Sequence, residues 1–310
     1  MKVSVLVMTY NHANFIRQAL DSVLMQRVSF PYEIIITEDF SSDGTREIII
    51  EYQNNYPEII RLSLSEKNLH SNEVVARGIE TAQGQFIALL DGDDYWTSPY
   101  KLQKQVDFLD SHPECAICFH NALVISEDES REPWNWTPTD QKEFSTFDDI
   151  WMGNFIATGS TMFRRGLFGQ VPEWYYSLRP MITDWPLHIL NAEHGKIGYI
   201  NETMSVYRYH SGGLYSSLSQ DQKLEWTAEF YKVMNANLNF RYDEIIRAAI
   251  FKYFWEWALE YEQRGDLDRA KSCFSKCLYE HRNNFTSLVK LFRLWLSLYI
   301  KHPISVMLLK

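Results

Sequence analysis

The 310-residue chain has few cysteines, and their spacing argues against a structural metal site. Cys115 and Cys118 form a C-x-x-C pair, and Cys273 and Cys277 stand one helical turn apart. A zinc site of four thiolates would need all four side chains. The first pair lies in an apolar run typical of a buried strand, where neighbouring side chains alternate between the two faces. We therefore expect free thiols, as in a protein of the reducing cytoplasm.

The chain also lacks positive charge and long apolar runs. Its 30 basic residues are outnumbered by 40 acidic ones, which excludes the overall basic field of a nucleic-acid-binding protein. No apolar run is long enough to span a bilayer. The apolar start, residues 1–8, is too short for a signal sequence and reads as a first strand. These features predict a cytoplasmic protein that does not bind nucleic acid.

The first hundred residues alternate between two patterns. Short β-branched runs predict strands at 3–8, 33–37, 60–64 and 86–90, and apolar residues at helical spacing predict helices at 14–26, 45–52 and 74–81. This alternation is typical of an α/β fold with a mainly parallel sheet and helices on its faces. Ligands of such sheets bind at the carboxyl ends of the strands.

The rest of the chain changes character near residue 215. Further strands are expected at 115–125 and 156–163, whereas residues 216–310 are helical with few glycines or prolines. We therefore predict a catalytic domain over 1–215, with halves at 1–100 and 101–215, and an all-helical region over 216–310. One helical hairpin in that region carries the small and aromatic positions of a tetratricopeptide repeat: Ala258, Tyr261, Gly265, Ala270, Phe274 and Cys277.

The last helix, expected over 287–301, is apolar around most of its circumference. Its polar residues form one narrow stripe of Lys290, Arg293, Ser297 and Lys301. Such a helix either lies on a membrane surface with its bases toward lipid head groups or packs between neighbouring helices. The pattern leaves both interpretations open.

Several carboxylates follow the strand predicted at 86–90. Asp91, Asp93 and Asp94 stand together in the run D-G-D-D, where they would repel one another unless a cation lay between them. Hard divalent ions prefer such oxygen ligands and keep open positions for phosphate oxygens. An acidic turn is the alternative, and the placement directly after a buried strand favours the metal site.

A second acidic pair, Glu38 and Asp39, ends the strand predicted at 33–37. One of these carboxylates can accept a hydrogen bond from a base N–H, while Ser42 or Asp43 can cap the helix that begins near Thr45. The strand at 3–8 likewise ends in polar residues, at 9–11. Three strand ends therefore bring polar groups to one edge of the sheet.

Residues 3–11, 36–45 and 88–94 together resemble the family 2 glycosyltransferases in order and spacing. The resemblance implies the GT-A fold, a nucleotide-binding α/β sandwich, and inverting sugar transfer with Mn²⁺ or Mg²⁺. It places the nucleotide against Thr9, Tyr10 and Asn11, the base on Asp39, the ribose near Asp91 and the metal on Asp93. Two positions depart from the family pattern: Glu38 stands where Asp is usual, and Phe40 where Gly is usual.

The resemblance extends more loosely to about residue 213. It implies that Asp184 is the general base, although an Asp before Trp185 and Pro186 also suits a helix cap. Arg208 is expected to pair with phosphate and His210 to ligate the metal or a phosphate oxygen, next to a glycine hinge. Residues 154–162 resemble the acceptor side of the site, with Thr158 and Ser160 as candidate pocket residues.

These expectations predict a metal-dependent hexosyltransferase. It would move a sugar from a nucleotide-sugar, with UDP favoured, to a saccharide or lipid-linked saccharide in bacterial surface polysaccharide assembly. A sugar nucleotidyltransferase is disfavoured because Tyr10-Asn11-His12 follows the first strand in place of a glycine-rich loop with an Arg. A non-catalytic scaffold built on the helical region is disfavoured by the intact acidic residues Asp39, Asp91, Asp93 and Asp184. A peripheral position on the inner face of the cytoplasmic membrane would suit a lipid-linked acceptor.

Overall fold

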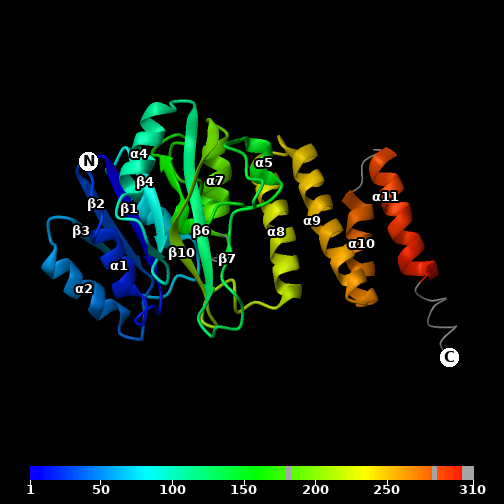
Figure 1. Ribbon diagram of the computed structural model, residues 1–310, viewed down its shortest axis with the longest axis horizontal. Coiled ribbons are helices and arrows are strands. Elements are labelled where there is room, and N and C mark those ends of the chain that lie inside the picture. Colours follow the sequence, from blue (N-terminus) through cyan, green and yellow to red (C-terminus); the bar gives the residue numbers. More distant parts are fainter. Residues whose placement is uncertain (179–182, 281–284, 302–310) are drawn as a thin grey trace. The chain divides into compact units, whose positions relative to one another are not determined.

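The computed structural model describes residues 1–178, 183–280 and 285–301. The chain divides into two compact units (Figure 1). The first comprises Met1–Ile150 and Asn154–Leu218, and the second comprises Trp151–Gly153 and Ser219–Lys310.

A ten-stranded sheet forms the centre of the first unit, with the strand order β3-β2-β1-β4-β9-β6-β10-β5. Its main strands are β1 (Val3–Thr9), β2 (Tyr32–Glu38), β3 (Ile60–Leu64), β4 (Phe86–Asp91), β5 (Tyr95–Trp96), β6 (Cys115–Ser126), β9 (Met162–Arg164) and β10 (Lys196–Tyr209). Two short strands, β7 (Trp134–Asn135) and β8 (Phe144–Ser145), pair with β6 and β10. β1 to β4 are mutually parallel, and β9 joins β4 to β6 in antiparallel fashion. The predicted α/β fold with a mainly parallel sheet is confirmed.

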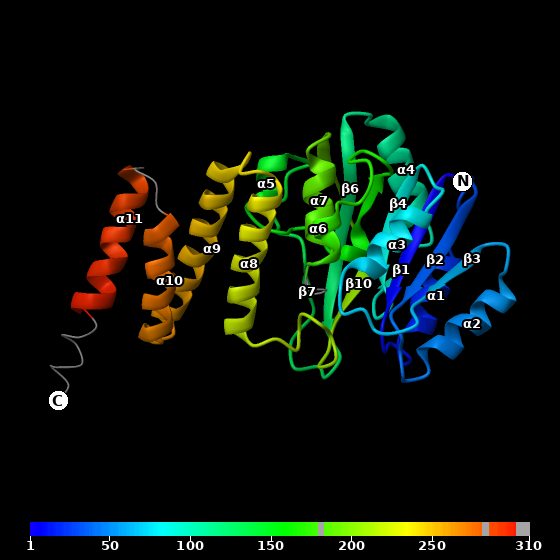
Figure 2. The ribbon, with the colours of Figure 1, turned by 180° about the vertical axis from the view of Figure 1, so that it is seen from behind.

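Helices cover both faces of this sheet, which explains the continuous apolar runs in the middle of β1, β2 and β4. Figure 1 shows α1 (Ile16–Leu24) and α2 (Thr45–Asn55) in front, and Figure 2 shows α3 (Glu73–Thr81), α6 (Glu173–Tyr176) and α7 (Asp184–Ala192) in front. Apolar residues of α1, α2 and α4 (Lys101–Ser111) share a core cluster with Val3, Val5 and Val7 of β1. A short helix, α5 (Phe147–Trp151), leads to the junction with the second unit.

The carboxyl ends of β1, β2 and β4 meet at one edge of the sheet. In the parallel register Thr9 lies opposite Glu38, and Met8 lies opposite Asp91. A backbone hydrogen bond from Asp39 N–H to the Thr9 carbonyl, 3.1 Å, continues the pairing just beyond the strands. The register therefore brings the polar residues after each strand to the same place.

The prediction of a strand at residues 156–163 is wrong for most of that range. Thr158–Ser160 form a 3₁₀ turn, and β9 starts only at Met162. The side chain of Ser160 donates to the carbonyl of Ala157, 2.7 Å, and the Ser160 N–H donates to the same oxygen, 2.9 Å. This local bonding competes with strand pairing, as is usual for serine and threonine.

The second unit is helical, with α8 (Gln220–Asn237), α9 (Asp243–Gln263), α10 (Leu267–Glu280) and α11 (Phe285–Leu296), followed by a π-helical turn at Ser297–Lys301. Ser219 and Gln222 form a capping box that starts α8. α9 and α10 make a hairpin that turns at Gly265, whose φ of +77° favours glycine. Among the described helices, none is both long and apolar enough to cross a membrane.

Candidate active site

The turn after β4 carries three aspartates and is held tightly against β1. Gly92 donates its N–H to the carbonyl of Met8, 2.7 Å, and Asp94 donates to the carbonyl of Asp91, 3.0 Å. A Cβ at position 92 would lie 2.8 Å from the hydroxyl of Thr9 and 2.9 Å from Nδ1 of His12. Glycine is therefore required here by the close approach of two elements.

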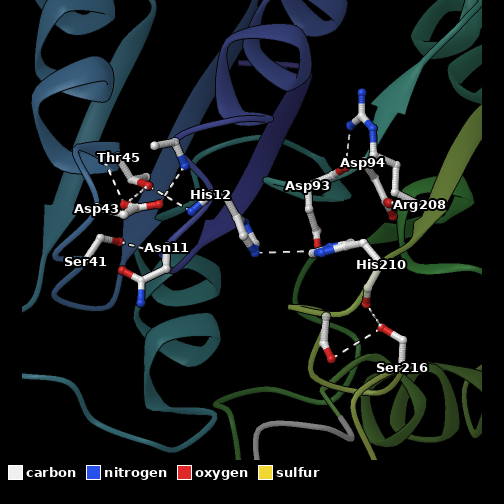
Figure 3. A network of polar contacts seen from close by, with 12 residues as sticks. Asn11, His12, Ser41, Asp43, Thr45, Asp93, Asp94, Arg208, His210 and Ser216 are labelled. Atoms are coloured by element: carbon white, nitrogen blue, oxygen red, sulfur yellow. Dashed lines mark hydrogen bonds and ion pairs between the residues drawn. The ribbon is translucent and has the colours of Figure 1, made fainter. Parts of the chain in front are cut away.

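Asp93 lies between two histidines that come from distant parts of the chain (Figure 3). Its Oδ2 is 3.0 Å from Nε2 of His210, after β10, and 3.5 Å from Nε2 of His12, before α1. Burial alone would raise the pKa of Asp93, but the two histidines outweigh it and hold this pKa below its usual value. The hydrogen bond to Asp93 in turn raises the pKa of His210.

The other two aspartates of the turn, the half-buried Asp91 and the buried Asp94, are repelled by neighbouring carboxylates. Burial, followed by the charges of Asp93 and Asp184, raises the pKa of Asp91 well above its usual value. Burial, Asp93 and Asp91 likewise raise the pKa of Asp94. Carboxylates crowded in this way favour a bound cation or proton, as the sequence pattern indicated.

Arg208, at the end of β10, is tied into the same turn. Its backbone N–H donates to Asp94, 2.8 Å, and its guanidinium donates to the Asp93 carbonyl and to Gln18. The guanidinium also lies over the ring of Tyr95, 4.5 Å from its centroid. Arg208 thus holds the acidic turn in place, while its expected phosphate contact stays a prediction.

Asp184 is the first residue of α7, and its charge acts on Asp91 in the acidic turn after β4. Its Oδ1 accepts the N–H of Trp185, 2.7 Å, and its Oδ2 accepts bonds from Asn154 and Thr158, each 3.2 Å. The N-cap itself is Thr183, without a side-chain cap bond, so the expectation of an Asp184 N-cap is wrong by one residue. Oδ1 therefore accepts a backbone N–H in the first turn of α7, and Oδ2 is held by Asn154 and Thr158.

Thr158 acts on both Asp184 and Asp91. It donates its hydroxyl to Asp184, and its polar side chain also favours the charged form of Asp91, which partly offsets the effect of burial on the Asp91 pKa. Ser160, the second candidate pocket residue, is fully buried and bonds to the Ala157 carbonyl. The structure therefore brings Thr158 into the site, whereas the hydroxyl of Ser160 points into the local turn.

Asp39 and Glu38 play different parts at the end of β2. Oδ1 of Asp39 accepts the N–H of Leu69, 2.9 Å, and burial raises the pKa of Asp39 despite this bond. Glu38 is fully buried and accepts from Nε of Arg46, 2.7 Å, and from the N–H of Ser41. Glu38 therefore fixes the loop, while Asp39 is only half-buried at the same edge.

The loops after β1 and β2 are joined by hydrogen bonds, visible at the left of Figure 3. Asn11 donates its N–H to Ser41, 2.9 Å, and its side chain accepts the N–H of Ser42, 2.9 Å. Asp43 accepts the N–H groups of Ala13, 2.9 Å, and Thr45, 3.0 Å. The N-cap of α2 is Gly44 rather than Ser42 or Asp43, although Asp43 satisfies the first helical N–H.

The remaining predicted nucleotide residues, Thr9 and Tyr10, differ in exposure. Thr9 is buried, and its hydroxyl has no hydrogen-bond partner within the described residues. Tyr10 is exposed at the same strand end. An unpaired buried hydroxyl is unusual in proteins and suits a position beside a ligand.

Phe40, one of the two departures from the family pattern, has a φ of +63°. This left-handed backbone explains why glycine is usual here, since a bulky side chain is strained in it. The ring stays exposed, and the guanidinium of Arg46 stacks on it with 5.2 Å to its centroid.

His12 belongs to the site but was not singled out from the sequence. It is enclosed beside Asp93, and burial lowers its pKa although Asp93 opposes this effect. Its Nδ1 is buried without a hydrogen-bond partner in the described part of the chain. Its position directly after the first strand, at the edge where the other polar residues lie, is the sequence feature that could have identified it.

Asp93 and His210 are the side chains of the site that could hold a divalent cation. Asp93 and His210 bring an oxygen and a nitrogen within 3.0 Å of each other, next to the crowded Asp91. The described residues contain no ready cluster of three metal-binding side chains. The Asp93 carboxylate suits Mg²⁺ or Mn²⁺ in a site that leaves other positions for phosphate oxygens and water, and the imidazole nitrogen of His210 favours a transition-metal ion such as Mn²⁺ over Mg²⁺. The four cysteines are free and buried, as expected.

Comparison with known proteins identifies the family. Residues 4–171 match the family described as Glycosyl transferase family 2. A relative from Bacillus subtilis (strain 168), the putative teichuronic acid biosynthesis glycosyltransferase TuaG, is 31% identical over 260 residues, which are 82% of this chain and 92% of TuaG.

Two solved structures share the fold. S. aureus TarS 1–349 in complex with UDP-GlcNAc has a TM-score of 0.59 at 20% identity, covering 89% of this chain and 82% of that one. The mannosyltransferase PcManGT from Pyrobaculum calidifontis, in complex with GDP-Man and Mn²⁺, has a TM-score of 0.56 at 14% identity, covering 99% and 83%. The first unit is thus a GT-A sandwich. With more than half of its length matched, the chain belongs to glycosyl transferase family 2.

Proposed function

We propose that this protein is an inverting, metal-dependent hexosyltransferase that moves a sugar from a UDP-sugar to a hydroxyl of a saccharide or lipid-linked saccharide. The observation that carries this proposal is the convergence of Asp91, Asp93 and Asp184, linked by Thr158, at the end of the parallel strands. The printed names of TuaG, for teichuronic acid, and of TarS, with UDP-GlcNAc, support bacterial surface polysaccharide assembly and a UDP donor.

Asp184 is assigned the role of general base. Its Oδ2 takes the proton from the acceptor hydroxyl, and the freed oxygen attacks the anomeric carbon from the side opposite the nucleotide. The bond from that carbon to the diphosphate oxygen breaks, and the nucleoside diphosphate leaves with the bonding electrons. Asn154 and Thr158 both donate to this oxygen, so they orient the carboxylate toward the acidic turn. A positioned base of this kind typically contributes about 10²–10⁴-fold to the rate.

The nucleotide is assigned to the edge formed by β1 and β2. Thr9, Tyr10 and Asn11 line this edge, and the half-buried carboxylate of Asp39, whose Oδ1 accepts from Leu69, is assigned to accept a base N–H. Asp91 lies beside the predicted ribose position. Arg208, whose guanidinium holds the turn through the Asp93 carbonyl, is assigned to pair with the diphosphate.

Asp93 and His210 are assigned to hold the metal, with His12 beside them. Mn²⁺ or Mg²⁺ bound there would neutralise the charge that develops on the leaving diphosphate. PcManGT, described with Mn²⁺, supports this choice of ion.

A thermal-shift panel of UDP-, GDP-, dTDP- and CMP-sugars, each with and without Mn²⁺, tests the donor. A ligand at 100 times its Kd stabilises the fold by about 2.7 kcal/mol, which is readily measured. We expect a shift that is largest for a UDP-sugar and depends on Mn²⁺. Equal shifts for all four bases, or shifts that ignore the metal, would contradict the donor assignment.

A further inference from the structure

The last described helix has two apolar faces. Leu291, Leu294 and Leu298 are buried, with at most 3% of each side chain exposed. Their spacing places them on one side of α11, and α11 lies beside α10 in both ribbon views (Figures 1 and 2). This buried side agrees with the interpretation, left open by the sequence, that the helix packs against a neighbouring helix.

A neighbouring side of the helix carries a ridge of exposed apolar residues, and the last ring of the ridge, Tyr299, has its centroid 6.3 Å from that of Phe274 on α10. We call Val289, Phe292, Trp295 and Tyr299 the aromatic ridge; their exposed fractions are 39%, 60%, 40% and 44%. The rings stack in sequence, with centroids 6.1 Å apart for Phe292 and Trp295 and 6.3 Å for Trp295 and Tyr299. Single exposed apolar residues are ordinary, whereas a continuous patch marks an interaction surface.

The charge around this ridge has one sign. Residues 281–310 contain five basic side chains and no acidic one, so the preceding 280 residues carry all 40 acidic groups of the protein. Arg293 is exposed next to Phe292, and the ammonium of Lys271 on α10 lies 5.0 Å from the ring centroid of Tyr299. A basic segment in an acidic protein indicates an anionic partner.

We propose that the aromatic ridge docks on the surface of a bilayer that contains anionic lipids. Aromatic side chains prefer the boundary between head groups and acyl chains, and nearby bases bind the lipid phosphates. A second copy of the chain fits less well, because a symmetric contact would bring two basic segments together. This proposal does not rest on the glycosyl-transfer chemistry, since every residue that carries it lies in the second unit.

Co-sedimentation of the full chain with vesicles tests the proposal. One set of vesicles contains phosphatidylglycerol and phosphatidylcholine, and the other contains phosphatidylcholine alone. We expect binding to the anionic set only. The double variant Phe292→Ser/Trp295→Ser should weaken it at least about tenfold through lost apolar burial. Arg293→Glu should weaken it at least about fivefold, the effect of about 1 kcal/mol for one charge near the surface.

The matched control is Phe240→Asn, in the turn between α8 and α9. Phe240 is 64% exposed and has a φ of +57°, which asparagine tolerates. The control should bind anionic vesicles like the unchanged protein, and thermal midpoints should show that every variant is folded. Equal binding by the unchanged protein and the double variant would overturn the proposal. A dimer in sedimentation velocity that the double variant splits, without vesicle binding, would assign the ridge to a second copy instead.

Discussion

The hydroxyl of Thr158 donates to Oδ2 of Asp184, 3.2 Å away, and also partly offsets the rise that burial causes in the pKa of Asp91. Twenty-six residues separate Thr158 from Asp184, and 67 separate it from Asp91. One small side chain thus joins the turn after β4 to the start of α7, which are the metal side and the base side of the proposed reaction.

The first prediction concerns Asp184→Asn. An amide keeps the size of the side chain but cannot accept a proton at neutral pH. We expect turnover to fall about 10²–10⁴-fold, while the donor-induced thermal shift stays unchanged, because the donor is assigned to other residues. Initial rates of nucleotide release and the thermal-shift panel measure the two effects.

The control for this change is Asp148→Asn in α5, since Asp148 is exposed and takes no part in the cluster. It should leave both measurements unchanged. Retained turnover in Asp184→Asn would remove Asp184 as the base.

The second prediction concerns Asp93→Asn. The amide oxygen can still accept the hydrogen bond from His210, but it loses the charge that a divalent cation requires. We expect the Mn²⁺-dependent part of the donor thermal shift to disappear and turnover to fall together with it. Asp107→Asn, at an exposed position of α4, is the control and should keep the full metal response. A metal response that survives in Asp93→Asn would place the ion elsewhere.

The sheet and its acidic edge were predictable from the sequence because both depend on local patterns. The apolar runs of β1, β2 and β4 fix their buried strands, and parallel pairing then brings Asp39 and Asp91 to one edge. The 3₁₀ turn at Thr158–Ser160 was not predictable, because serine and threonine hydroxyls decide it by local hydrogen bonds that periodicity does not reveal.

Long-range contacts set the limit of the prediction. His12 was missed because nothing in its neighbourhood shows that it meets a carboxylate 81 residues later. The last helix left two interpretations open for a similar reason. Its leucines and its aromatic residues are equally apolar in sequence, and only packing against α10 separates a buried side from an exposed one.

The third prediction concerns the backbone at Phe40. A β-branched residue is strained at a φ of +63°, whereas glycine is not. We expect Phe40→Val to be less stable than Phe40→Gly by about 1–2 kcal/mol in urea unfolding. Ile50, also exposed but lying inside α2 with helical backbone, is the matched position. There the valine variant should be at least as stable as the glycine variant, and the same order at both positions would refute the strain.

The fourth prediction concerns acid stability and His120 on β6. The ring is fully buried; Nδ1 lies 2.9 Å from the Asn121 carbonyl, and Nε2 has no hydrogen-bond partner among the described residues. Burial, followed by the charge of Lys101, lowers the pKa of His120 to about 3. The unfolded chain therefore binds a proton below a pH of about 6.5, where the folded protein does not. Stability is complete above this pH and is lost as the pH falls toward 3.

Between pH 7.5 and 5.5 this one histidine should remove about 1.4 kcal/mol from the free energy of unfolding. His120→Gln does not titrate, so urea unfolding at the two pH values should show a loss that is smaller by this amount. Burial also lowers the pKa of His12 and His188, so part of the acid sensitivity will remain in the variant. His194→Gln, at an exposed position, is the control and should keep the full loss. If His120→Gln lost as much unfolding free energy between pH 7.5 and 5.5 as the unchanged protein, His120 would not contribute to the acid sensitivity. The lowered pKa of the buried ring would then be contradicted.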